Sequence, residues 1–179
     1  VTGYQAIIKY WGADHPKNQA PPPAERWTTS VKIEVILYEI LAFPIERKTV
    51  HHPYSDKLSK ALLDVPCYHI YELLSEKLRA LIQRSYTAPR DVYDIWYISK
   101  QVPDIDWKAV RTAFDTKMAF KGLQFTGIEQ MLNSATDKSL QASWKNSLGH
   151  QIPTEQLPEY DMIKVEVLNL LHEIFRKGH

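Results

Sequence analysis

The chain of 179 residues has a single cysteine, Cys67, only six glycines and no long hydrophobic run. One cysteine cannot form an intrachain disulfide, and it has no Cys-x-x-Cys partner, so we expect a reducing, cytoplasmic setting. No apolar segment approaches the roughly 20 residues that span a bilayer, and no signal peptide precedes the first strand-like segment. These absences predict a protein with no membrane partner.

The chain also lacks a charge excess of either sign, because 22 Lys and Arg against 21 Asp and Glu leave a net charge of +1. Such a total neither demands nor excludes nucleic acid, since a local basic patch can be hidden in it. With 44% hydrophobic and 24% charged residues, the composition is that of a globular protein rather than a disordered tail. The length suffices for one sizeable core or two small lobes.

Strand-like segments come first along the chain. Residues 3–12 and 27–40 are rich in β-branched and aromatic side chains, which predicts strands. The stretch between them carries four of the eleven prolines and is expected to be a loop. Residues 43–54 form a shorter extended candidate, and residues 56–64 read as one or two helical turns.

After Cys67 the apolar residues recur with helical spacing. Helices are expected at 69–84, 89–101, 106–119, 126–133, 138–147 and 158–177. Strands followed by a helical lobe predict the α+β fold class, with a division into residues 1–66 and residues 67–179.

Charges occupy unusual places on the first two expected helices. On a helical wheel, Lys77 falls inside the apolar stripe between Ile70 and Leu73, and Arg84 lies about 20° from Lys77. On the next helix, Asp91 and Asp94 share a side with apolar residues. The opposite side of the first helix is expected to face solvent; it carries Glu72, Ser75, Arg79 and Gln83.

Two interpretations of these charges stay open. A lone charge removed from water costs several kcal/mol unless it is paired, so Lys77 and the aspartates form either a structural bridge or a polar ligand site. Asp91 has an alternative role, because a carboxylate three residues past a cap at Ala88 can satisfy first-turn amides. Lys77 can also lie along apolar surface with its ammonium in water.

A second candidate site lies on the strand expected at 27–40. The strand period of two sends Lys32 and Glu34 to one face and Val31, Ile33 and Val35 to the other. A Lys-x-Glu pair on a strand suits a metal-binding carboxylate beside a phosphate-neutralising cation. Exposed strand faces also alternate Lys and Glu without any such role.

The ordered motifs resemble the AbiEii/AbiGii toxin family of nucleotidyltransferases over residues 27–177. They are VKIEV, YHIYELLSEKLRALIQRSYTAPRDVYDIWYI, FDTKMAF and LQASWKNSL. The most specific part is Glu-Lys-x-x-Ala-Leu…Arg followed by Arg-Asp-x-x-Asp, at positions 76–94. The resemblance implies a partial nucleotidyltransferase-type (polymerase-β-like) sheet, to which residues 1–66 contribute the remaining strands, followed by a C-terminal helical bundle in residues 67–179.

The resemblance also implies roles for particular residues. The implied catalytic groups are three carboxylates and one lysine: Glu34, Lys77, Asp91 and Asp94. Glu34 is in addition the implied metal ligand. The implied phosphate-binding groups are cations: Lys32, Arg84, Arg90 and Lys117. For Lys117, the alternative is an ordinary solvated helix lysine.

The family's chemistry implies a nucleoside triphosphate as donor, RNA and especially tRNA ends as acceptor, Mg²⁺ as cofactor and a cognate antitoxin as protein partner. The sequence departs from the family in one respect. In the family, a Gly-Ser loop followed by Asp-x-Asp or Asp-x-Glu holds magnesium and nucleotide, whereas no glycine here is followed by serine. Magnesium is therefore expected only with that motif present.

Two explanations of the missing motif stay open. Either the motif lies outside these 179 residues, which the strand-first start at Val1 favours, or the chain binds without catalysis. The 179 residues alone are expected to be inactive in both cases. The alternative function is a non-catalytic helical binding module in which the Lys77–aspartate bridge is only structural.

Overall fold

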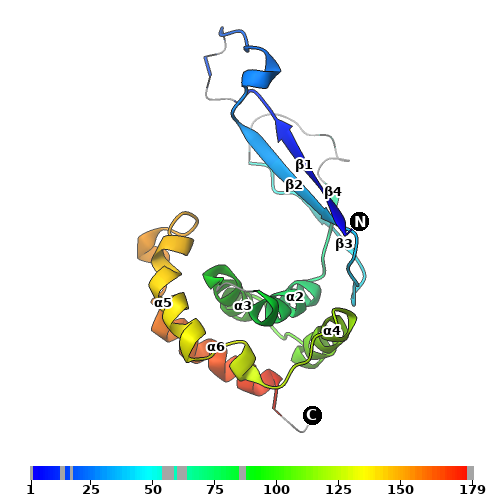
Figure 1. Ribbon diagram of the computed structural model, residues 1–179, viewed down its shortest axis with the longest axis vertical. Helices are drawn as coiled ribbons and strands as arrows, with labels where there is room; N and C mark the ends of the chain where they lie inside the picture. The colour runs from blue at the N-terminus through cyan, green and yellow to red at the C-terminus, as the bar shows by residue number, and fades with distance from the viewer. Residues whose placement is uncertain are drawn as a thin grey trace. The chain divides into compact units, whose positions relative to one another are not determined.

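The computed structural model describes residues 2–12, 15–16, 18–53, 59, 64–84 and 88–176. The chain forms two compact units, Val1–Ile40 and Leu41–His179, and strands precede the helices along the sequence (Figure 1). The α+β prediction is confirmed. The boundary expected between residues 66 and 67 separates the remaining strands of a nucleotidyltransferase core from a helical domain, and it stays a prediction. The helical turns expected at 56–64 lie outside the described residues, except for residues 59 and 64.

The first unit is built on one antiparallel pair of strands. β1 (Gly3–Lys9) pairs with β2 (Ser30–Ile36), and Gln5 lies opposite Glu34. Both strands occur where β-branched residues predicted them, although each is shorter than expected. The proline-rich connection contains a short 3-10 helix, Ala24–Arg26, because its prolines exclude a longer helix or a paired strand.

The two faces of this β1–β2 sheet differ in character. One face is polar around Gln5, Lys32 and Glu34, as the strand period predicted. The residues of the other face are all exposed within the structure and mostly apolar: Tyr4, Ala6, Ile8, Val31, Ile33 and Val35.

The second unit begins with another antiparallel pair, β3 (Glu46–Thr49) and β4 (Asp64–Cys67). β3 occupies four residues of the longer extended segment expected at 43–54. The side chain of Arg47 lies 2.8 Å from that of Asp64, which joins the two strands by an exposed ion pair. β4 leads almost directly into the first helix of the bundle.

The helices of this unit are α2 (Ile70–Gln83), α3 (Pro89–Gln101), α4 (Trp107–Phe120), α5 (Ser134–Leu148) and α6 (Tyr160–Ile174). Their starts follow local chemistry. The His69 ring and the Asp106 carboxylate each accept a hydrogen bond from a first-turn amide. Pro89 opens α3 at a position where its missing N–H costs nothing.

The helix expected at 126–133 is wrong. Only Ile128–Gln130 form a short 3-10 helix there. The reason lies at Asn133, whose side chain accepts from the amides of Ala135 and Thr136, while the Thr136 hydroxyl accepts from the Asn133 amide. This reciprocal cap starts α5 at Ser134 and ends any helix that comes before it.

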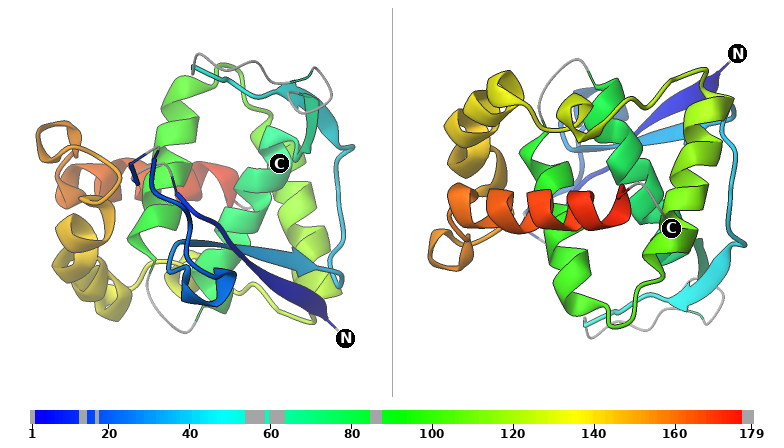
Figure 2. Two further views of the ribbon diagram at one scale, coloured as in Figure 1. Left: turned by 90° about the horizontal axis from the view of Figure 1, so that it is seen from above. Right: turned by 90° about the horizontal axis from the view of Figure 1, so that it is seen from below.

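The core of the second unit lies between these helices. α2 contacts both α3 and α4, and α3 contacts α5 and α6; Figure 2 shows α6, coloured orange to red, crossing α3. Trp144 and Phe114 are the largest fully buried apolar side chains of this core. The Trp144 indole donates a hydrogen bond of 3.0 Å to the Pro158 carbonyl, so its polar atom is satisfied. Of the helices in the described ranges, none combines the length and the apolar composition that a bilayer crossing requires.

Candidate functional site

α2 and α3 bring together the lysine and the two aspartates that stood out on the helical wheels. Lys77 Nζ lies 3.3 Å from Asp91 Oδ1 and 2.5 Å from Asp94 Oδ2. The lysine projects from the middle of α2, and both carboxylates come from the first two turns of α3. The contact between the two helices therefore contains an ammonium held between two carboxylates. We call Lys77, Asp91 and Asp94, together with Arg84, the Lys77 cluster.

Arg84 supplies the second cation of the Lys77 cluster. Its Nη1 atom lies 2.6 Å from Asp91 Oδ2. The side chains of Asp91 and Lys77 are 5% and 15% exposed, whereas those of Asp94 and Arg84 are 32% and 42% exposed. The cluster is thus buried at Asp91 and reaches solvent at Asp94 and Arg84, so it is not a sealed bridge.

Asp91 turns both of its carboxylate oxygens toward these cations. Ala88 caps α3 without a side-chain hydrogen bond. Oδ2 faces Arg84 Nη1 and Oδ1 faces Lys77 Nζ, so the buried carboxylate has a cation at each oxygen. These ion pairs offset the free-energy cost of removing the carboxylate from water.

Lys32 and Glu34 form the second candidate group, on β2 of the first unit. Their charged ends lie 2.5 Å apart, and Gln5 Nε2 donates to Glu34 at 3.0 Å. The Lys32 ammonium holds the pKa of Glu34 below its usual value, mainly by hydrogen bonding. Both side chains are more than half exposed. Glu34 is therefore an ionised carboxylate that a solvent-borne ligand can reach.

Arg90 and Lys117, the other two residues predicted to bind phosphate, lie in different surroundings. Arg90 is exposed at the start of α3, next to Asp91. Lys117 is fully buried and forms ion pairs with Glu72 and with Glu76, the latter at 2.6 Å. The alternative of a solvated Lys117 is wrong, because α4 packs its lysine directly onto α2.

The expectation for the polar side of α2 is also wrong in part. Glu72, Ser75 and Arg79 were expected in solvent but are buried, whereas Gln83 is exposed as expected. The reason is that α2 has two neighbours, α3 on its apolar stripe and α4 elsewhere on its surface. The Lys117 ammonium from α4 compensates the acidic side chains of α2.

This buried network was missed by sequence reasoning. Glu72 Oε2 accepts hydrogen bonds from the backbone amides of Ala42 and Phe43, at 2.9 and 3.1 Å. Glu72 therefore joins α4, through Lys117, to the segment at the start of the second unit. The available signal was the i, i+4 spacing of Glu72 and Glu76 together with a lysine between Phe114 and Met118 in "FDTKMAF".

The network shifts the pKa values of its members. Burial by itself lowers the pKa of Lys117, but hydrogen bonds to Glu72 and Glu76 outweigh burial and raise it. Burial likewise favours a higher pKa for Glu76, yet hydrogen bonds from Lys117 and Arg79 hold that pKa below its usual value. Both groups are therefore charged at neutral pH.

Acidification should destabilise the fold through Glu76. A carboxylate whose pKa is lower in the folded state stabilises fully above its unfolded pKa, and this contribution is lost as the pH falls through the folded pKa. We expect the free energy of unfolding to decline from about pH 5 to about pH 3, and the decline to be shallower in Glu76→Gln. Urea unfolding across this range measures it; identical slopes in both proteins would contradict the assignment.

Metal binding depends on which oxygen, nitrogen and sulfur ligands the structure brings close together. Among the residues that the structure describes, no group of three or more His, Cys, Asp or Glu side chains lies close enough to hold a metal ion. Glu34 offers one carboxylate, whereas Mg²⁺ in proteins is held by carboxylates together with substrate phosphates.

The comparison with known proteins agrees with the motifs. The model of the nucleotidyl transferase AbiEii toxin family, of type IV toxin–antitoxin systems, matches residues 10–165. No match is found among the curated proteins. The matched range is well over half of the chain and contains β2, α2 and α3. Such a family implies a nucleotide substrate and an antitoxin partner. The chain belongs to the AbiEii family of nucleotidyl transferase toxins.

Proposed function

We propose that this protein transfers a nucleotide from a nucleoside triphosphate to RNA, with tRNA ends as the favoured acceptor, in the cytoplasm. The proposal depends on the Lys77 cluster. In this cluster a lysine is held between two carboxylates, and the cluster reaches solvent at Asp94. Family membership supports the reaction class. A cognate antitoxin is the proposed protein partner.

The cluster would supply charged groups at fixed positions near the reacting phosphates. In nucleotidyl transfer, a hydroxyl attacks the α-phosphorus in line, the new P–O bond forms and pyrophosphate leaves. Fixed cations near the phosphates stabilise the charge that develops. Lys77 would lie against the triphosphate, while Arg84 and Arg90 would contact phosphates of the nucleotide or of the RNA acceptor.

The carboxylates would orient these cations and receive the proton. Asp91 and Asp94 each approach Lys77 and so limit the directions in which its ammonium can point. The more exposed Asp94 is the better placed of the two to accept the proton of the attacking hydroxyl. We propose that Glu34, with Lys32 beside it, likewise orients a cation or accepts the proton. Lys117 is paired with Glu72 and Glu76 and would support α2 rather than touch phosphate.

Magnesium is part of the proposal. When bound, it would neutralise phosphate charge, and Glu34 would contribute one oxygen ligand. The other ligands would come from a Gly-Ser…Asp-x-Asp motif, which these 179 residues do not contain.

A non-catalytic binding module is the second candidate, and the near-complete burial of Asp91 favours it. In that case the Lys77 cluster would only join α2 to α3. Nucleotide binding separates the two, because a purely structural bridge has no affinity for triphosphates.

Calorimetric titration tests the proposal on the protein expressed from its complete gene. With Mg²⁺ and ATP, CTP, GTP or UTP in turn, we expect saturable binding of at least one nucleotide. Lys77→Gln should weaken that binding about tenfold, the size expected for one charge-assisted phosphate contact. Lys138→Gln removes an exposed lysine of α5 and should bind like the wild type. Absence of binding, or equal affinities of the Lys77→Gln variant and the wild type, would leave only the structural bridge.

A further inference from the structure

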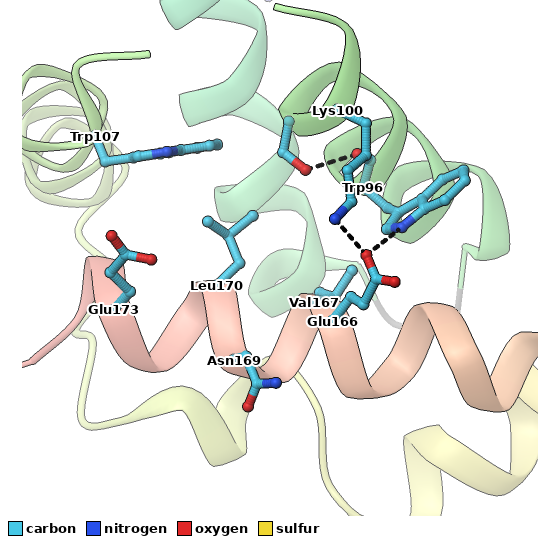
Figure 3. A pocket seen from close by; sticks show the side chains of 9 residues that line it. Trp96, Lys100, Trp107, Glu166, Val167, Asn169, Leu170 and Glu173 are labelled. Carbon is cyan, nitrogen blue, oxygen red and sulfur yellow. Dashed lines mark hydrogen bonds and ion pairs between the residues drawn. The ribbon is translucent and has the colours of Figure 1, made fainter. Parts of the chain in front are cut away.

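A pocket lies on α3, α4 and α6 and includes none of the residues of the Lys77 cluster. Its volume is about 350 Å³, and Figure 3 shows two indole rings, Trp96 from α3 and Trp107 from α4, above side chains of α6. Apolar Val167 and Leu170 of α6 line it between them. The proposed transfer reaction does not use this pocket, although Trp96 stands within one of the family motifs.

At one end of the pocket, polar contacts among Trp96, Lys100 and Glu166 hold the side chains in place. Trp96 Nε1 donates to Glu166 Oε2 at 3.1 Å, and Lys100 Nζ lies 2.6 Å from the same oxygen. The Lys100 hydrogen bond is the main reason why the pKa of Glu166 is lowered, with Trp96 second. Glu166 is thus a carboxylate that fixes the Trp96 ring and neutralises Lys100.

The other end of the pocket carries a second carboxylate. Glu173 is exposed on α6, and in Figure 3 its carboxylate points toward the Trp107 ring. One lysine and two glutamates line the pocket, so its net charge is −1, and the lysine is already paired with Glu166. The pocket therefore combines aromatic faces with an exposed acidic group.

We propose that this pocket binds an arginine side chain from a basic segment of a partner protein. A guanidinium is flat, stacks on an indole face and pairs with a carboxylate in the same plane, so Trp107 and Glu173 together match its chemistry. A nucleic acid is the poorer occupant, because its phosphates would approach Glu166 and Glu173, and the pocket's lysine is already neutralised. The inference is independent of nucleotidyl transfer.

The test follows the indole N–H signals of the ¹⁵N-labelled chain during titration with the peptide acetyl-Arg-Arg-Arg-amide. The five tryptophans give distinguishable signals once Trp→Phe variants assign them. We expect saturable shifts of the Trp96 and Trp107 signals, while those of Trp11, Trp27 and Trp144 stay in place. Glu173→Gln should weaken the affinity about threefold, as expected for an exposed ion pair beside an aromatic ring.

The matched control is Glu155→Gln, which removes one exposed negative charge outside the pocket. It should leave the affinity unchanged. Acetyl-Glu-Glu-Glu-amide and the oligonucleotide dT6 should not move the Trp96 and Trp107 signals. Three results would overturn the proposal: no saturable shift with the arginine peptide, an affinity that Glu173→Gln does not change, or dT6 moving the same signals as strongly.

Discussion

Replacement of Lys117 by methionine is expected to lower the free energy of unfolding by about 3–5 kcal/mol. The Lys117 side chain is fully buried and pairs with Glu72, which is 1% exposed, and with Glu76. Removal of the ammonium leaves the Glu72 carboxylate buried without its countercharge, and an uncompensated buried charge is far costlier than an absent pair. For a chain of this length the melting temperature should fall by about 10 °C.

Urea unfolding followed by circular dichroism measures the effect. Lys108→Met removes an exposed lysine of the same helix and should change stability by less than about 0.5 kcal/mol. The double variant Glu72→Gln/Lys117→Met should recover part of the loss, because glutamine still accepts from the amides of Ala42 and Phe43 without a buried charge. A Lys117→Met protein as stable as the Lys108→Met protein would show that the pairs contribute little.

Replacement of Lys77 by alanine is expected to reduce nucleotidyl transfer about 100- to 1000-fold, the usual effect of removing one preorganised group that stabilises transition-state charge. The measurement is incorporation of α-³²P-labelled nucleotide into tRNA by the protein expressed from its complete gene, with Mg²⁺ present. Lys77 contacts both aspartates of its cluster. Its loss should therefore remove the proposed phosphate contact and leave Asp94 without this cation, whereas Asp91 keeps Arg84.

Two controls separate a loss of catalysis from a loss of folded protein. Rates are normalised to the folded fraction from circular dichroism, since removing Lys77 leaves Asp91 with Arg84 as its cation. Lys138→Ala should retain wild-type labelling, because this lysine is exposed on α5. If Lys77→Ala labels RNA as well as the wild type does, the role assigned to this lysine is wrong.

The Lys77 cluster could be predicted from helical wheels alone. A lysine inside the apolar stripe of α2 and two aspartates on one side of α3 indicated a polar contact between these helices, and the Lys77 ammonium lies 2.5–3.3 Å from the two carboxylates. Helix positions were also readable, because caps and prolines mark the starts of α3, α4 and α6 within two residues. The segment 126–133 was misread, because its apolar spacing resembles a helix while the Asn133 cap starts α5 later.

The sequence by itself determined the α+β order of elements, the family and the charged residues of α2 and α3, since local periodicity and motif order do not depend on neighbours. Only the tertiary structure decided which charged groups are buried together. A helical wheel divides α2 into one apolar and one polar side, but α4 covers part of the polar side and brings Lys117 to Glu72 and Glu76. Burial of charge depends on a countercharge from a distant segment, and no local pattern encodes that.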